Sequence, residues 1–219
     1  AGQTNFKAKV IHNPIEPEAK RNEGSAKKAS GLVSITSRVY EIAWIGNIKS
    51  QKRPDWVPFI GKELVGLGLS NFRINMLGEI RDPELMAKVN SDVVYLGLED
   101  KVVFKGWVNN PKELIWNSDV LISTSHREAY GRTLIEAMSL QTPVLATDEG
   151  GHPEVLEDGR LGTLVRGGPE AFAKAIIEAF QQREKTSSKA QAAQRRVLDR
   201  NSPIRHRDEV LDVYRSILK

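Results

Sequence analysis

The sequence predicts an α/β fold built around a doubly wound parallel sheet. Short apolar segments typical of buried strands recur between residues 39 and 183, and segments with apolar residues at helical spacing separate them. This alternation implies a parallel sheet that helices cover on both faces. The chain has 219 residues, of which 40% are hydrophobic and 27% charged, so it is long enough to bury a sizeable core.

Six segments have the composition of buried strands: residues 40–45, 72–77, 102–104, 119–122, 143–146 and 162–165. Gly46 and Gly78 follow the first two directly, as expected where a strand gives way to a loop. Ligands of open α/β sheets bind outside the carboxyl ends of the strands. The loops that follow these strands are therefore where the sequence predicts a site.

Start signals and apolar faces predict the helices between the strands. Pro54 is placed for the first turn of one helix, and Asp82 with Pro83 supplies a cap and a first-turn proline for the next. Asn110 with the following proline opens a short third helix, in which Glu113 has the position of a capping-box residue. A further helix is expected over residues 169–184, and Ser202 with the following proline starts the last one.

The most informative stretch is residues 123–153, which contains a helix pattern between the strand-like segments 119–122 and 143–146. Gly131 lies at the expected start of that helix. Its first turn would hold Arg132, Thr133 and Leu134, whose backbone N–H groups have no partner within the helix. The helix macrodipole adds positive potential there, so we expect an anion site suited to a phosphate.

Two carboxylates, Glu128 and Glu136, flank this turn. Eight residues of helix rise roughly 12 Å, so acids with this spacing could bind hydroxyls at both ends of an elongated ligand. Alternatively, Glu136 is only a solvated helix residue. Residues 128–136, EAYGRTLIE, resemble the E-x7-E motif of retaining glycosyltransferases with the GT-B fold.

Further segments follow in the order of one such family. They are Ala137-Met138, residues 143–147 (PVLAT), residues 150–154 (GGHPE) and residues 157–159 (EDG). Over residues 39–183 the chain is similar to the glycosyl transferases group 1 family, also called glycosyltransferase family four. The resemblance implies a Rossmann-like sheet, the C-terminal or donor-binding domain of a GT-B enzyme, followed by C-terminal helices.

The resemblance also implies roles for residues of the central motif. Lys52 and the N–H groups of the first helical turn would hold the donor diphosphate and stabilise charge on the departing nucleotide. Glu136 would accept hydrogen bonds from the ribose, and Glu128 from the donor sugar. We expect Lys52 and Glu128 to be catalytic. The substrate-binding site is expected to be lined by Tyr130, Gly131, Arg132, Thr133 and Leu134. Front-face attack by the acceptor is favoured, although a nucleophilic Glu128 stays open.

Some positions depart from the family pattern. Asn47 stands where the family usually has an arginine, and Arg53 and Ala129 where it commonly has glycine. We expect Asn47 to bind the donor without charge, with Arg53 or Arg132 supplying the missing cation. The alternative for Lys52 is an ordinary surface lysine before a helix.

The family's nucleotide base lies against the corner formed here by Trp107 and Val108. Trp107 either stacks on that base or packs against the protein.

The composition indicates which other classes of ligand the chain is expected to bind. The chain has no cysteine and no Asp-x-Asp pair, and its four histidines are far apart, so we expect no metal or other cofactor. The net charge is +4, and the lysines and arginines are scattered along the chain. This pattern is typical of an ordinary basic protein or of one that acts near anionic ligands, and it does not favour nucleic acid binding. No transmembrane run or signal peptide is visible, so we expect a cytoplasmic protein, with a membrane-surface acceptor left open.

We divide the chain into an interdomain linker or N-terminal extension (1–38), a nucleotide-sugar-binding domain (39–185) and C-terminal helices (186–219). Residues 10–16 loosely resemble the family's domain junction, and residues 16–31 have the composition of a flexible linker. The N-terminal acceptor-binding domain is expected to lie outside this chain.

The predicted function is that of the donor domain of a retaining, metal-independent glycosyltransferase, which transfers a hexose from a UDP- or GDP-sugar to a glycan or lipid. The alternatives are a noncatalytic nucleotide-sugar-binding module and a GT-B-related epimerase.

Overall fold

The computed structural model describes residues 9–15 and 38–218. Six strands form one sheet in the order β3-β2-β1-β4-β5-β6, and every neighbouring pair is parallel. The strands are β1 (Tyr40–Ile45), β2 (Phe72–Leu77), β3 (Val102–Gly106), β4 (Val120–Ser123), β5 (Val144–Thr147) and β6 (Thr163–Val165). The order runs outward in both directions from β1 and β4, which confirms the predicted doubly wound, Rossmann-like sheet.

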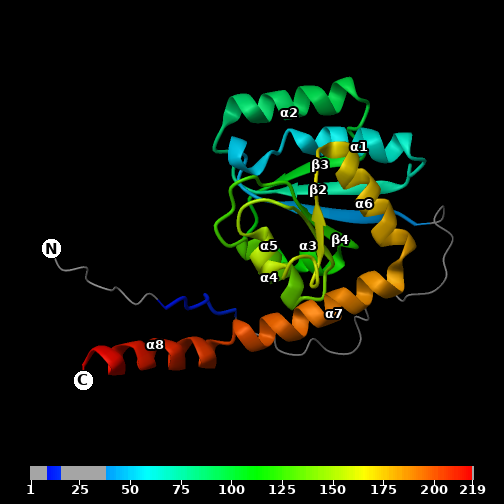
Figure 1. The fold of residues 1–219 in the computed structure, drawn as a ribbon. Coiled ribbons are helices and arrows are strands. Elements are labelled where there is room, and N and C mark those ends of the chain that lie inside the picture. Colours follow the sequence, from blue (N-terminus) through cyan, green and yellow to red (C-terminus); the bar gives the residue numbers. More distant parts are fainter. Residues whose placement is uncertain (1–8, 16–37, 219) are drawn as a thin grey trace.

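Helices cover both faces of the sheet (Figure 1). One face carries α1 (Trp56–Gly66), α2 (Pro83–Tyr95) and α6 (Pro169–Gln181). The other face carries α3 (Lys112–Asn117), α4 (Arg132–Ser139) and α7 (Arg183–Arg200). Two short helices, η1 (Ser50–Lys52) and α5 (His152–Val155), lie in connections after β1 and β5.

The core consists of one apolar cluster on each face of the sheet. Strand β1 contributes to both because successive side chains of a strand point to opposite faces. Ile42 and Trp44 pack under α1 and α6, whereas Ala43 belongs to the cluster under α4. Burial on both faces explains why residues 42–45 of β1 are all apolar.

Some element boundaries differ from the predicted ones. Helix α1 begins at Trp56, two residues beyond Pro54, and the short helices η1 and α5 were not predicted. The helix expected over residues 169–184 ends at Gln181, and α7 begins at Arg183. Two caps were placed correctly: the Asp82 side chain accepts from Leu85 N–H at 2.9 Å, and Ser202 from Arg205 N–H at 3.1 Å. The cap expected at Asn110 was wrong by one residue, because Pro111 is the N-cap of α3; Asn110 accepts from Lys112 N–H at 3.1 Å.

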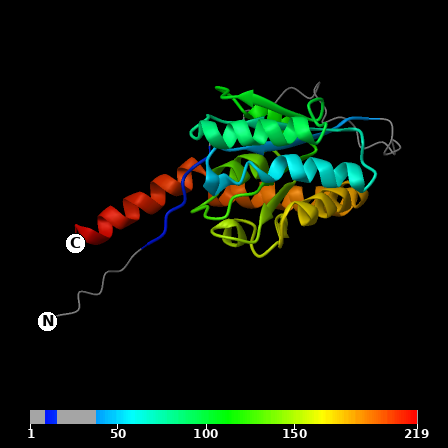
Figure 2. The ribbon, with the colours of Figure 1, turned by 90° about the horizontal axis from the view of Figure 1, so that it is seen from above.

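The last helix, α8 (Pro203–Ile217), projects away from the sheet beside residues 9–15 (Figures 1 and 2). Asn201, at the α7–α8 junction, fastens that segment: its side chain donates to Asn13 O at 2.9 Å, and its carbonyl accepts from Ile15 N–H at 2.8 Å. The linker predicted over residues 16–31 lies outside the described residues. Among the described helices, none is long and apolar enough to cross a membrane.

Candidate functional site

The carboxyl ends of β1, β4 and β5 are adjacent in the sheet, so the loops after these strands meet at one edge. Thr124 joins the first two loops. Its hydroxyl accepts from Trp44 Nε1 at 2.9 Å and donates to the carbonyl of Lys52 at 2.6 Å. In addition, His126 N–H donates to the carbonyl of Gln51 at 3.1 Å. Buried β1 and β4 therefore fix the backbone of Lys52 against the loop that carries Glu128.

The N-terminus of α4 is formed by Gly131, whose backbone is left-handed with φ 70° and ψ 55°. Within the described part of the chain, no side chain caps this helix. One expectation needs correction: Leu134 N–H already donates to the Gly131 carbonyl at 2.9 Å. Three N–H groups were expected to donate to an anion. In the structure, those of Arg132 and Thr133 remain as the candidate donors.

Gly150 and Gly151 let the loop after β5 approach the loop after β4. Gly151 N–H donates to the carbonyl of Glu128 at 2.7 Å. A Cβ atom on Gly151 would lie 2.4 Å from the carbonyl oxygen of Ala129, and one on Gly150 would lie 2.7 Å from that of Glu128. The close approach needs glycine at both positions, and it fixes the backbone on which Glu128 sits.

Three basic side chains at this edge are paired with three carboxylates. Lys52 Nζ forms an ion pair with Glu128 Oε2, and both side chains are about one-fifth exposed. Arg132 Nε lies 3.1 Å from Glu136 Oε1, one helical turn along α4. The structure therefore brings Lys52, Glu128 and the start of α4 together, as the sequence predicted.

Arg53 is held in place by two groups. Its guanidinium donates to both Glu149 oxygens at 2.7 and 3.2 Å and lies 4.5 Å from the ring centre of Trp56. Arg53 and Arg132 are the predicted replacements for the family arginine, and in the structure each is bound to a carboxylate. A ligand that used either cation would have to compete with that pairing.

The other expected site residues are Asn47, Trp107 and Val108. The Asn47 side-chain oxygen accepts from Glu79 N–H at 3.3 Å, so this side chain holds the turn after β2. Trp107 is 66% exposed, which argues against the alternative that it packs against the protein. Val108 lines a broad hollow of about 1250 Å³, whose wall includes Glu41 and Asp119 near the amino ends of β1 and β4.

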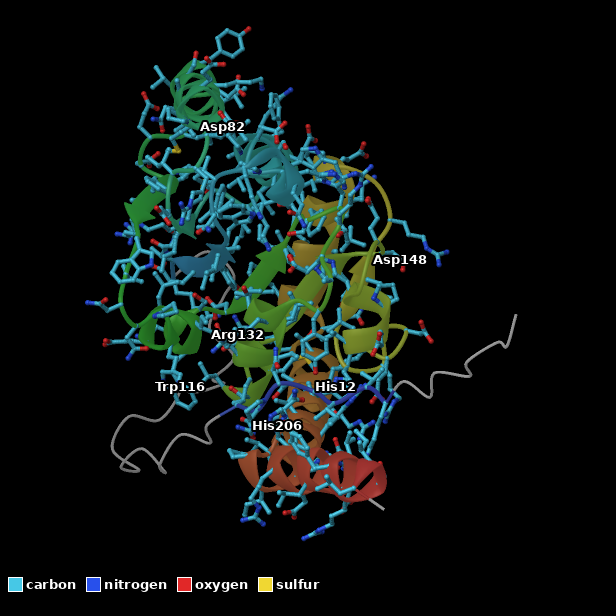
Figure 3. All side chains as sticks on the ribbon, turned by 90° about the vertical axis from the view of Figure 1, so that its left-hand side faces the viewer. His12, Asp82, Trp116, Arg132, Asp148 and His206 are labelled. Carbon is cyan, nitrogen blue, oxygen red and sulfur yellow. The ribbon has the colours of Figure 1, made fainter. Side chains whose placement is uncertain are left out.

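Tyr130 contacts the N-terminal segment 9–15 and the α7–α8 junction. Its ring stacks on His12 at 5.3 Å, and its hydroxyl accepts from Asn201 Nδ2 at 2.9 Å. Figure 3 shows His12 near His206, whose Nδ1 lies 2.9 Å from the His12 carbonyl. The contact of Tyr130 with substrate stays a prediction, whereas its contact with residues 9–15 was not predicted.

His152 is a residue of this edge to which sequence reasoning gave no role of its own. It is 0% exposed, and its ring nitrogens face Thr147 and Ser123. Burial lowers its pKa below the usual value, and this is the largest effect on the group. Its position directly after Gly150-Gly151 is the sequence signal that could have identified it.

Comparison with known proteins assigns the chain to a family. The family model described as glycosyl transferases group 1 matches residues 69–196, more than half of the chain. The chain belongs to this family. It is 33% identical over 122 residues to the N-acetyl-alpha-D-glucosaminyl L-malate synthase of Bacillus anthracis, covering 55% of this chain and 29% of that enzyme. It is 39% identical over 84 residues to the D-inositol 3-phosphate glycosyltransferase of Streptomyces scabiei. That match covers 37% of this chain and 19% of that enzyme.

Solved structures share the fold of this group 1 chain. A glycosyltransferase of Rickettsia africae matches with a TM-score of 0.75 and 28% identity, covering 84% of this chain and 49% of that one. HepE of Anabaena, in complex with UDP and glucose, matches with a TM-score of 0.74 and 22% identity. The match covers 83% of this chain and 49% of HepE. The C-terminal domain of LpcC from Francisella tularensis, a group 1 family protein, matches with a TM-score of 0.64 and 24% identity, covering 75% and 87%.

The chain thus spans about half the length of the first two structures, less than a third of the two named relatives, and most of the LpcC domain. These matches confirm the predicted fold and its correspondence to the C-terminal domain of a group 1 glycosyltransferase.

Proposed function

We propose that this chain is the donor-binding half of a retaining, metal-independent glycosyltransferase. The enzyme would transfer a hexose from a UDP- or GDP-sugar to a glycan or lipid acceptor. One observation carries the proposal: Lys52, Glu128 and the uncapped N-terminus of α4 meet at the carboxyl edge of the sheet. The structural neighbour HepE, which was solved with UDP and glucose, supports a nucleotide sugar as the ligand.

In this proposal the diphosphate lies over Gly131. The N–H groups of Arg132 and Thr133 donate to it, and Lys52 leaves Glu128 to pair with a phosphate oxygen. These donors stabilise the charge that develops on the nucleotide as the sugar departs. The two N–H groups are fixed by the helix before the ligand arrives, and Lys52 is already paired with phosphate in the bound state, so little reorganisation is needed at the moment of reaction.

The two glutamates would bind the two ends of the donor. Glu136 accepts from the ribose hydroxyls, and Glu128 accepts from hydroxyls of the sugar once its partner Lys52 has turned to phosphate. We favour attack by the acceptor on the face from which the nucleotide leaves, with a phosphate oxygen taking the acceptor proton. That oxygen lies beside the forming bond, so no further general base is required.

The acceptor-binding half would be supplied by a second domain, and the reaction would take place in the cytoplasm, with a membrane-surface acceptor as one option. The second candidate function is a noncatalytic module that binds nucleotide sugars through the same site. Measuring both binding and transfer with a panel of UDP- and GDP-sugars distinguishes the two. Binding together with transfer by the chain joined to an acceptor domain supports the enzyme, and binding without transfer supports the module.

Substituting each glutamate tests the proposed orientation of the donor. Glu136→Gln keeps one acceptor oxygen but loses the charge, so it should weaken UDP or GDP and the matching sugar donor by similar amounts. Glu128→Gln should leave the plain nucleotide unchanged or slightly tighter and weaken only the sugar donor. Isothermal titration of both variants with both ligands makes the comparison. If Glu128→Gln weakens the plain nucleotide as much as Glu136→Gln does, the ligand lies in the opposite direction over Gly131.

Divalent metal should be dispensable for donor binding. In the described ranges, no group of three or more His, Asp or Glu side chains is placed to hold a metal ion. We expect UDP or GDP to bind with the same affinity in EDTA as in Mg²⁺ or Mn²⁺, because Lys52 and the α4 N-terminus supply the positive potential. A large loss of affinity in EDTA would overturn the metal-independent site.

A further inference from the structure

We propose that His152 is the positioning residue of the diphosphate site: its neutral ring joins the ends of β4 and β5 and supports the turn at Gly131. The inference rests on the proposed function, because it concerns the same anion site. His152 would not touch the donor. It would set the backbone geometry of the groups that do.

The ring of His152 is fixed at both nitrogens. Nδ1 lies 3.0 Å from the carbonyl oxygen of Thr147 at the end of β5. A carbonyl can only accept, so Nδ1 carries the proton and donates to it. The Thr147 hydroxyl also lies 3.0 Å from Nδ1, and it donates its own proton to the carbonyl of Ser125. This arrangement selects one tautomer, with the proton on Nδ1.

The other nitrogen reaches the neighbouring strand. Nε2 lies 3.4 Å from the hydroxyl of Ser123, the last residue of β4, and in the selected tautomer it accepts from that hydroxyl. The pair differs from a nucleophilic Ser-His arrangement, because Nδ1 faces a carbonyl and not a carboxylate. The ring therefore bridges the ends of two adjacent strands, the edge from which both site loops start.

The same ring lies beneath the anion site. A Cβ built on Gly131 would lie 3.5 Å from His152 Cδ2, so the ring lies next to the space beside the left-handed turn that begins α4. On its other side, the preceding residue Gly151 donates to the carbonyl of Glu128 at 2.7 Å. One buried side chain thus braces the turn that presents the N–H groups of Arg132 and Thr133.

The ring acts in its neutral form. It is fully buried, and the charged groups that face it are Glu128 from the loop after β4, Lys52 from η1 and Glu149 from the loop after β5. Lys52 opposes a positive ring, while the two carboxylates favour one, and burial outweighs them by lowering the pKa. A protonated ring would also turn Nε2 into a donor and break its acceptance from Ser123.

The test compares a nucleotide with a nucleoside. His152→Leu removes both ring hydrogen bonds, whereas His152→Asn keeps a donor near the Thr147 carbonyl. We expect His152→Leu to weaken UDP at least tenfold while leaving uridine within about twofold in ligand-observed NMR, and His152→Asn to recover part of the loss. Thr142→Val is the matched control: Thr142 is buried, and its hydroxyl donates to the Ile115 carbonyl at 2.9 Å. It should lower Tm without changing UDP affinity.

Unchanged UDP affinity in a folded His152→Leu chain would overturn the positioning role. Equal losses for UDP and uridine would do the same and show a purely structural role. If the substituted chains do not fold, ¹⁵N NMR of the unaltered chain decides: a proton on Nε2 at the pH of the binding measurements overturns the proposal. Failure of the unaltered chain to bind UDP or GDP would instead overturn the proposed function, a result distinct from these.

Discussion

Replacing Gly78 with alanine is expected to lower the free energy of unfolding by on the order of 3 kcal/mol. Gly78 follows β2 with φ 151°, a conformation that a side chain rarely adopts. A Cβ atom there would lie 2.0 Å from the carbonyl oxygen of Gly46 and 2.6 Å from its carbonyl carbon. Because both atoms belong to backbone, the strain cannot be relieved by turning a side chain.

The effect should reach the anion site, because Gly46 lies next to the stem of Lys52. A Cβ built on Gly46 would meet Lys52 Cγ and Cδ at 3.4 Å. Chemical denaturation measures the loss of stability. Gly66→Ala, in α1, is the matched control, since nothing lies within 4 Å of its Cβ position, and it should stabilise by about 0.5–1 kcal/mol. Equal stability of the two variants would contradict the close packing of the loops after β1 and β2.

The sequence was sufficient to predict the sheet because buried strands on both faces leave a simple signal. Strands β1 and β2 were placed to the residue, since a glycine follows each apolar run. The break at Gln182 was not predictable in the same way. Its neighbours are all good helix formers, and the change of direction comes from packing α7 across α4. Intrinsic helix propensity has only a weak influence on where such a helix ends, and tertiary contacts override it.

The site was predicted less completely for a related reason. Glu128 and Gly131 were identified from a motif that is continuous in sequence. The pairing of Lys52 with Glu128 joins residues that are far apart in the chain, so only the register of β1 against β4 brings them together. The same holds for Tyr130 with His12 and for His152 with Ser123. Their sequence environments contain no signal for these partners.

The pairing of Lys52 leads to the last prediction. Lys52→Ala should weaken UDP or GDP by about 1–3 kcal/mol, the scale of a charge-assisted hydrogen bond, which is roughly 5- to 150-fold in Kd. The fold should survive because β1 and β4 hold the Lys52 backbone through Thr124. Lys62→Ala, on an exposed position of α1, removes the same charge and should leave affinity unchanged. Isothermal titration at fixed ionic strength compares the variants, and unchanged affinity in Lys52→Ala would remove this residue from the site.

The single variant overstates the contribution of the cation, because it leaves Glu128 as an uncompensated carboxylate close to the phosphates. The double variant Lys52→Ala/Glu128→Gln removes both charges. We therefore expect it to bind the nucleotide more tightly than Lys52→Ala does, but less tightly than the unaltered chain. That order would show that ligand phosphate and Glu128 compete for one lysine. If the double variant binds no better than Lys52→Ala, Glu128 does not face the phosphates, and the ion pair has no part in admitting the donor.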